Sequence, residues 1–165
     1  MSDAANRSHA EIAASAEASL ERLWSGIGAS ALDALVDGEA VDQAELDRLY
    51  DQGREALAQE RLDEALDAFA SLAVRAPGKP EYQFGYALCL QHFGQVKEAG
   101  RHFAASLALD PSDAACAYRL GECLAGCGYL DDARDALNAA LALCRLPDCD
   151  PGIAPLAESL LDRLA

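Results

Sequence analysis

The sequence contains few aromatic and few basic residues, and each shortage excludes a class of protein. Aromatic residues make up 6% of the 165-residue chain, although 52% of the chain is hydrophobic. Ala and Leu therefore supply most of the apolar content, and their high helix propensity favours closely packed helices. Lys and Arg number 13 against 28 Asp and Glu, which gives a formal charge of −15. Because nucleic-acid binding needs clustered basic side chains, we expect no nucleic-acid partner.

The chain also lacks the patterns of secreted and membrane proteins. No CxxC pair occurs among the six cysteines, and we expect the cysteines within helices to act as small apolar fillers. The N-terminus has no basic start followed by an apolar core, and no apolar run approaches the roughly 18 residues that cross a bilayer. We therefore expect a protein of a reducing cytoplasm that does not insert into membranes.

Catalytic and metal-binding patterns are scarce as well. Cys89 and His92 lie three residues apart on one face of a predicted helix and could form half of a metal site. A structural zinc ion needs four ligands at suitable spacing, and no second pair is evident. We recognise neither a glycine-rich phosphate loop nor a Cys–His nucleophile with a third orienting group. We predict a protein without catalytic residues, metal or cofactor; the alternative is an enzyme or metalloprotein that uses this Cys–His pair.

What the sequence does contain is a repeat of 34 residues. Two short amphipathic helices within a 34-residue period are the signature of tetratricopeptide repeats. Such units stack into a solenoid, because none of them can bury its apolar face alone. We therefore predict an all-α tetratricopeptide solenoid whose core is formed by the recurring positions. These positions are Ala65, Ala99 and Ala133; Phe69, Phe103 and Leu137; and the small residues Gly53, Ala87 and Gly121; Leu62, Val96 and Leu130 recur at the same step.

The expected organisation has four parts. A mobile N-terminus (1–18) precedes an N-terminal helical segment (19–41), whose apolar residues must pack on the solenoid or on another copy of the chain. Three repeats follow over 42–147 (46–79, 80–113 and 114–147), and a C-terminal capping helix lies within 148–165. Asp42 and Glu45 have the spacing of a capping box. The predicted helices are 43–58, 62–75, 81–92, 96–109, 114–126, 130–144 and 153–164.

The first helix of each tetratricopeptide pair lines the concave groove, so its outward positions are the candidate binding site. Tyr50, Phe84 and Tyr118 form a second series at the 34-residue step, and none of them is needed for the predicted core. Aromatic rings make good anchors for an extended peptide. The alternative is that these rings pack against the neighbouring repeat. The candidate groove residues are Tyr50, Arg54, Leu57, Phe84, Leu88, Gln91, Tyr118, Arg119 and Glu122.

The groove also differs from one known kind of tetratricopeptide site. Domains that hold the acidic C-terminus of major chaperones resemble one another in a carboxylate clamp of Lys and Asn side chains. Tyr50, Gly85 and Ala115 stand at those places here, and only Arg54 and Arg119 are positive. We therefore do not expect that class of partner.

Beyond these positions, the chain resembles the type III secretion chaperones that serve translocator proteins, the class II secretion chaperones of Gram-negative pathogens. The resemblance covers about residues 25–145. It rests on the N-terminal apolar segment with glycine breaks, on Leu46-Asp47-Arg48-Leu49-Tyr50 at the start of the first repeat, and on Gly121-Glu122-Cys123-Leu124 in the third. The number of repeats, the closing helix and the acidity agree. Gln52 and Ala56 depart from the family, in which larger apolar residues often occupy these positions.

The resemblance implies an all-helical chaperone of the bacterial cytoplasm. It would keep hydrophobic translocator proteins soluble by holding an extended segment of each in the concave groove. The alternative is a general tetratricopeptide adaptor for protein–protein interaction in a bacterium. The resemblance also implies a homodimer formed through the N-terminal helices, and the alternative there is a monomer in which Trp24 packs on its own solenoid. The residues mapped to dimerisation are Leu20, Leu23, Trp24, Ile27, Leu32 and Leu35.

Overall fold

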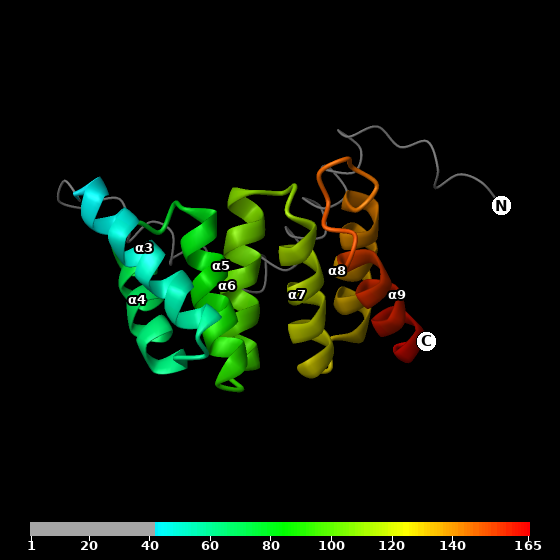
Figure 1. Ribbon diagram of the computed structural model, residues 1–165. Coiled ribbons are helices and arrows are strands. Elements are labelled where there is room, and N and C mark those ends of the chain that lie inside the picture. The colour runs from blue at the N-terminus through cyan, green and yellow to red at the C-terminus, as the bar shows by residue number, and fades with distance from the viewer. Residues whose placement is uncertain (1–41) are drawn as a thin grey trace.

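The computed structural model describes residues 42–165, and this part of the chain is a row of helices without strands (Figure 1). The predictions for residues 1–41, including the dimerisation residues, lie outside the described residues. Three pairs of antiparallel neighbours are followed by one further helix. In chain order the helices are α3 (Gln43–Ala58), α4 (Leu62–Arg75), α5 (Pro80–His92), α6 (Val96–Leu109), α7 (Ala114–Gly126), α8 (Leu130–Leu143) and α9 (Ile153–Arg163).

Aspartates begin two of the first helices. The Asp42 carboxylate accepts a hydrogen bond from the Ala44 backbone N–H, and that of Asp113 accepts one from Cys116. Both caps satisfy an N–H group that a helix start leaves without an intrahelical partner. The predicted capping box is wrong, because Glu45 accepts two hydrogen bonds from Arg75, at 3.0 and 2.8 Å, instead of turning back to residue 42. This ion pair joins the start of α3 to the end of α4 and lowers the pKa of the Glu45 carboxyl.

The turn inside each pair of helices is built the same way three times. Glu60, Gly94 and Gly128 have φ values of 58°, 74° and 83° and lie one 34-residue step apart. The N–H of the residue after each donates to a carbonyl five residues back, as Arg61 does to Ala56 at 2.8 Å. This left-handed turn at the end of a helix favours glycine, which carries no β-carbon to clash. Repeat one places a glutamate there and so carries conformational strain that the other two repeats avoid.

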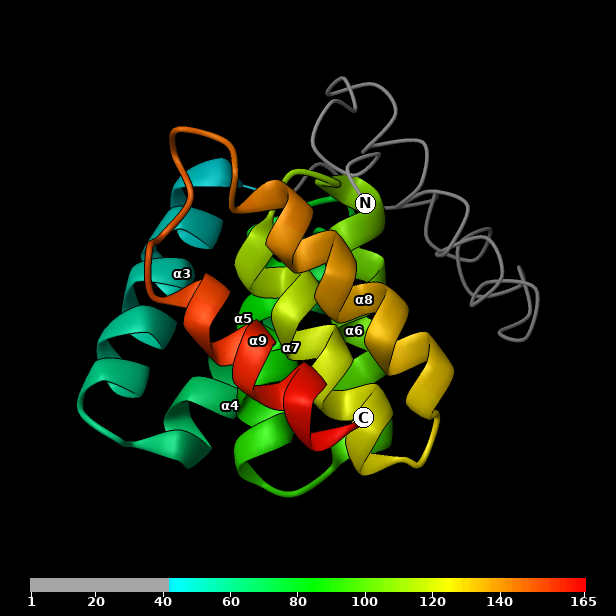
Figure 2. The same cartoon turned by 90° about the vertical axis from the view of Figure 1, so that its right-hand side faces the viewer.

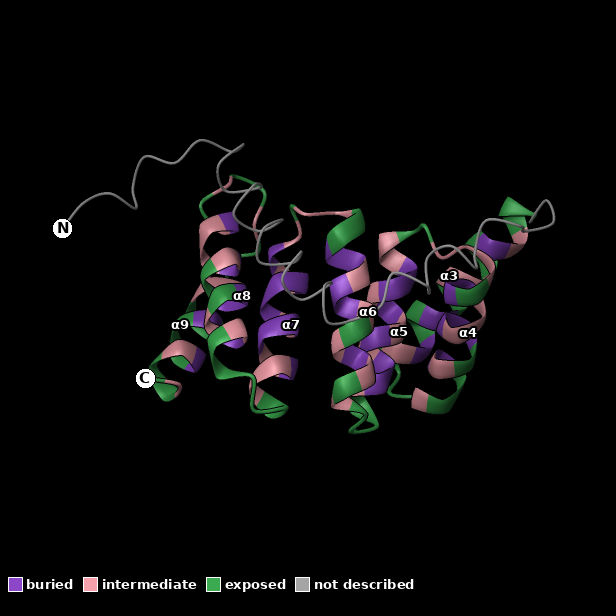
Figure 3. Ribbon diagram, turned by 180° about the vertical axis from the view of Figure 1, so that it is seen from behind, coloured by how far each residue is buried: buried purple, intermediate pink, exposed green. Residues whose placement is uncertain are grey.

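The recurring large residues fill the space between helices, as the repeat predicted. Phe69 and Phe103 are almost fully buried, and so is Leu137. A β-carbon built at Gly53 would meet the Phe69 ring at 2.9 Å, and one built at Gly121 would meet Leu137 at 2.8 Å. Glycine at these positions therefore lets the first helix of each pair approach the second. In Figure 3 the buried positions lie where one helix meets the next, and exposed residues gather at the turns.

The last helix covers the end of the row. α9 packs against α8 and α7, with Ala157 and Leu160 buried in the core shared by the second and third repeats (Figure 2). Arg134 of α8 donates to the backbone carbonyl of Leu164 and holds the end of α9 in place. No helix within residues 42–165 is both long enough and apolar enough to span a membrane.

Candidate functional site

The three first helices, α3, α5 and α7, touch one another through side chains. The rings of Tyr50 on α3 and Tyr82 on α5 lie 5.4 Å apart between centroids. Gln91 on α5 donates its side-chain amide to Glu122 on α7, with Nε2 3.3 Å from Oε2. We call the surface formed by the nine candidate residues on these helices the first-helix face.

The aromatic series of this face is tied to the core more closely than predicted. Tyr50 is half-buried and lies edge-on to Phe69, with ring centroids 6.0 Å apart, and Phe84 meets Phe103 in the same way at 5.5 Å. Tyr118 is only 5% exposed. The prediction that the core needs none of these rings is therefore wrong. Tyr50 and Phe84 each pack on the core phenylalanine of their own repeat, and Tyr118 is itself a buried member of the core.

Glu122 collects the polar side chains at the α7 end of the face. Its carboxylate accepts a hydrogen bond from the Tyr118 hydroxyl at 2.7 Å, one from Arg119 at 2.9 Å and the one from Gln91. Burial, and then the neighbouring carboxylate, raise the pKa of Tyr118 to about 12, so its hydroxyl stays protonated and donates. The structure thus brings four of the nine predicted residues into one hydrogen-bonded cluster, the Glu122 cluster: Gln91, Tyr118, Arg119 and Glu122.

The remaining five residues lie toward α3 and α5. The Arg54 guanidinium carbon is 5.8 Å from the centre of the Tyr50 ring, so this exposed charge lies over a half-buried aromatic ring. Such contacts are weakly attractive at exposed sites. Leu57 and Leu88 are half-buried and pack against the cores of the first repeat and of the second and third repeats. The face therefore has aromatic and aliphatic edges on α3 and α5 and the Glu122 cluster between α5 and α7.

Two family models for tetratricopeptide repeats match the chain, one over residues 50–114 and the other over residues 90–143. Together they span residues 50–143, which is more than half of the chain. The chain is a tetratricopeptide-repeat protein. Its three helix pairs and the contacts between first helices are those that this repeat requires.

No curated protein matches the chain in sequence. SycD, the type III secretion translocator chaperone of Yersinia enterocolitica, shares the fold with a TM-score of 0.71 at 20% identity, over 79% of this chain and 95% of SycD. PcrH of Pseudomonas aeruginosa, bound to the chaperone binding region of PopD, gives 0.71 at 21%, over 76% and 95%. The first tetratricopeptide domain of Spaghetti (RPAP3), bound to an HSP90 peptide, gives 0.66 at 20%, over 77% and 95%. These likenesses establish a shared fold.

One polar cluster in this tetratricopeptide core was not foreseen. Gln83 is buried, donates its amide to the Pro77 carbonyl at 3.1 Å, and lies 2.8 Å from Nδ1 of His102. The His102 ring also meets Tyr86 edge-on, with centroids 4.7 Å apart, and burial lowers the His102 pKa. The repeat could not reveal this cluster, because the residues one step away from Gln83 are Leu49 and Ala117, which form no such bonds.

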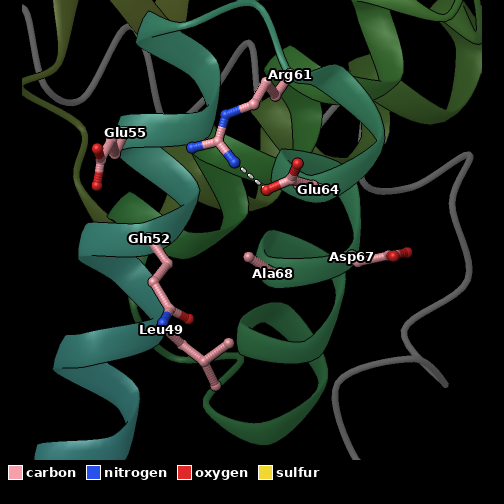
Figure 4. Close-up of a pocket in the computed structure, with 7 residues that line it drawn as sticks. All are labelled: Leu49, Gln52, Glu55, Arg61, Glu64, Asp67 and Ala68. Atoms are coloured by element: carbon pink, nitrogen blue, oxygen red, sulfur yellow. Dashed lines mark hydrogen bonds and ion pairs between the residues drawn. The ribbon is translucent and has the colours of Figure 1, made fainter.

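Among residues 42–165, no other helix covers a facet between the two helices of the opening repeat. A cleft of about 530 Å³ is lined by three residues of α3 and by four residues at the start of α4, where Arg61 pairs with Glu64 (Figure 4). These residues are Leu49, Gln52, Glu55, Arg61, Glu64, Asp67 and Ala68. In the second and third repeats, 34 and 68 residues further along the chain, the residues equivalent to Gln52 and Glu55 are buried or half-buried and pack on a preceding repeat. This facet is therefore the end of the solenoid. The residues equivalent to Gln52 are Tyr86 and Leu120, and those equivalent to Glu55 are Cys89 and Cys123.

The candidate Cys–His pair is separated by burial. Cys89 is fully buried in the core of the first repeat, and burial raises the pKa of its thiol to about 11, whereas His92 is exposed. A metal ligand or nucleophile needs an accessible thiolate, which this position disfavours. Within residues 42–165 no three His, Cys, Asp or Glu side chains are grouped as a metal site would require.

Proposed function

We propose that this protein is a chaperone of a type III secretion system that binds hydrophobic translocator proteins in the bacterial cytoplasm and keeps them soluble, without catalysis or cofactor. The observation that carries the proposal is the first-helix face, which combines the half-buried aromatic edges of Tyr50 and Phe84 with a fixed polar cluster. The likeness to SycD, a translocator chaperone, and to PcrH bound to the chaperone binding region of PopD supports this reading over other uses of the fold.

The face suits an extended apolar segment with polar or basic ends. Tyr50 and Phe84 are held edge-on by core phenylalanines, so a client would meet rings that are already ordered and lose little further entropy. The Glu122 cluster offers donors and acceptors for the client backbone, and the charge of −15 attracts basic flanking residues. Covering the client lowers the concentration of free apolar surface by mass action alone.

The proposal is tested by removing the two ordered aromatic edges. Tyr50→Ala with Phe84→Ala should weaken binding of a translocator from the same genome by more than tenfold, since aromatic anchors each contribute about 2 kcal/mol or more. Binding is measured by titration calorimetry with the purified segment and by solubility of the co-expressed client. Tyr129→Ala is the matched control, because this aromatic ring is 55% exposed at the start of α8 and does not belong to the first-helix face.

Circular dichroism and thermal melting accompany both variants. If the double variant keeps its fold and still binds the client as tightly as the control, the first-helix face is not the site. If it loses its fold, Arg54→Glu replaces it, because this side chain of the face is exposed and lies over the Tyr50 ring.

A general tetratricopeptide adaptor is the second candidate, favoured by the same fold in Spaghetti (RPAP3) bound to an HSP90 peptide. The two readings differ in the partner. Affinity capture from the native bacterium followed by mass spectrometry should recover translocator proteins under the first proposal. Capture of other proteins in stoichiometric amount, with no secretion genes beside this one, would favour the adaptor.

A further inference from the structure

Two cysteines meet in the connection between α8 and α9. Cys144 caps the C-terminal end of α8, and Cys149 lies five residues on, in the loop that leads to α9. Their sulfur atoms are 2.7 Å apart. Both thiols are half-buried, whereas Cys89, Cys116 and Cys123 are buried in the helical core. Among the cysteines of residues 42–165, these two are therefore placed to react with each other.

We propose that Cys144 and Cys149 form a redox-active dithiol that is oxidised to an intramolecular disulfide by small neutral or cationic disulfide compounds. A disulfide needs its sulfurs about 2.05 Å apart, so the bond requires only a small movement of side chains in a loop. The backbone already holds the pair together, because the Cys149 N–H donates to the Leu146 carbonyl and that of Leu146 donates to Leu143. This proposal is independent of the client-binding face.

Cys149 is the entry point for the oxidant. It lines a cleft of about 500 Å³ between the α6–α7 connection and the α8–α9 loop, together with Leu143, Leu146 and Ile153. Burial and the neighbouring thiol raise the pKa of Cys144 to about 12, so this thiol is poorly ionised and acts second. It becomes reactive when Cys149 is already bonded to a sulfur that can leave.

The reaction balances as two thiol–disulfide exchanges. The Cys149 thiolate attacks one sulfur of the small disulfide, which breaks that S–S bond and releases one thiolate that takes up a proton. The Cys144 thiolate then attacks Cys149 Sγ, forms the protein disulfide and releases the second small thiol. The protein loses two electrons and two protons, and the small disulfide is reduced to two thiols.

The charge of the cleft selects the oxidant. Four carboxylates line the same cleft, and they repel anionic disulfides such as oxidised glutathione while they attract cationic ones such as cystamine. We therefore expect cystamine to oxidise the pair at least about tenfold faster than oxidised glutathione, with the difference shrinking in high salt. The four are Asp110, Asp113, Asp148 and Asp150.

The bond would tie the end of α8 to the approach of α9. Because α9 packs on both α8 and α7, the crosslink would restrain the helix that covers the last repeat. Cross-linking removes freedom from the unfolded chain. The oxidised protein should therefore melt at a higher temperature than the reduced protein, and a reductant should reverse the shift.

The test uses the reduced full-length protein with cystamine as oxidant. After alkylation and digestion, trypsin cleaves at Arg145, between the two cysteines, so the disulfide joins two separate peptides that mass spectrometry detects. We expect this linked pair in the wild-type protein and in Cys127→Ser, which removes an exposed cysteine elsewhere. Cys149→Ser should lack both the link and the melting shift.

Two outcomes would overturn the proposal. One is a native protein that carries only mixed disulfides, or a link through Cys127, after complete reaction. The other is a linked pair that forms as fast in urea as in buffer, because the fold would then contribute nothing to the proximity of the sulfurs. The wild-type peptide map decides between them even if a serine variant folds poorly.

Discussion

Phe69 is held between two glycines that belong to different repeats. A β-carbon at Gly53 would meet the ring at 2.9 Å, and one at Gly85 would come within 2.2 Å of it. Gly85 stands at a groove position of the repeat pattern, but the structure buries it beneath this ring. The Phe69 ring therefore sets the spacing of α3, α4 and α5. This spacing is too close for a β-carbon at either glycine position.

Gly85→Ala should destabilise the protein by about 1–3 kcal/mol, the usual cost of overpacking a core. The sign of this change in unfolding free energy is informative, because helix propensity by itself favours Ala over Gly by about 1 kcal/mol. Urea unfolding followed by circular dichroism measures the effect. Gly78→Ala is the control, since a β-carbon there meets nothing within 4 Å, and it should leave the midpoint unchanged. Equal midpoints for the two variants would mean that the Phe69 ring can move aside.

Residues that recur at the 34-residue step were predictable, and residues that act once were not. Phe69 and Phe103 recur because every repeat of a solenoid needs a large apolar side chain to fill the same space between its helices. Glu45 has the spacing to cap its own helix, and only the fold shows that its carboxylate accepts hydrogen bonds from Arg75 instead. Tyr118 was misjudged for a related reason: helical spacing shows that a side chain faces a surface, but not how deeply neighbouring helices bury it.

At the scale of elements, the predicted helices agree with the observed ones to within one residue at each end. Helix-capping and turn residues explain this agreement. Asp42 and Asp113 cap α3 and α7, Pro80 starts α5, and Gly94 and Gly128 lie in the turns between paired helices. These signals are local, so a sequence is enough to read them. The contacts between helices, such as those of Gln83 with the α4–α5 connection and with α6, depend on tertiary packing and had no local signal.

His102 makes the packing of α6 on α5 sensitive to pH. Its ring contacts Gln83 and Tyr86 of α5, and Glu98 and Arg101 are the charged groups that act on it from α6. Burial lowers its pKa below the usual 6.5, so the folded state binds this proton less readily than the unfolded state does. The contribution to stability is therefore complete above pH 6.5 and is lost as the pH falls through the folded-state value.

We expect the urea midpoint of the wild-type protein to fall on acidification below pH 6.5, and to fall less in His102→Asn, whose amide does not titrate. His92→Asn should behave as the wild type does, because that histidine is exposed. Protonation of Glu45 removes further stability only below pH 4.5, the ordinary pKa of a glutamate, because Arg75 lowers the pKa of this carboxyl in the folded state. Parallel pH profiles for the wild type and His102→Asn would show that this histidine does not couple folding to pH.

On the scale of the whole molecule, the solenoid has two different ends. α9 covers the C-terminal end with buried Ala157 and Leu160. At the opposite end, no helix within residues 42–165 covers the facet of α3 and α4, where Gln52 and Glu55 replace the apolar residues of later repeats. A polar facet of this kind has less need of a cover than an apolar one, because its side chains are already solvated. That difference favours a partner, over the chain's own solenoid, for the apolar residues of segment 19–41.

We therefore predict that Trp24→Glu converts a homodimer into a monomer, since a buried charge at a central aromatic contact weakens an interface by about a hundredfold or more. Light scattering across a concentration series measures the change, and Trp24→Phe, which keeps an apolar ring, should remain a dimer. Thermal melting separates the alternative. If Trp24 packs on its own solenoid, Trp24→Glu leaves the mass unchanged and lowers the melting temperature at every protein concentration. An unaltered mass and an unaltered melting temperature together would remove this residue from any interface.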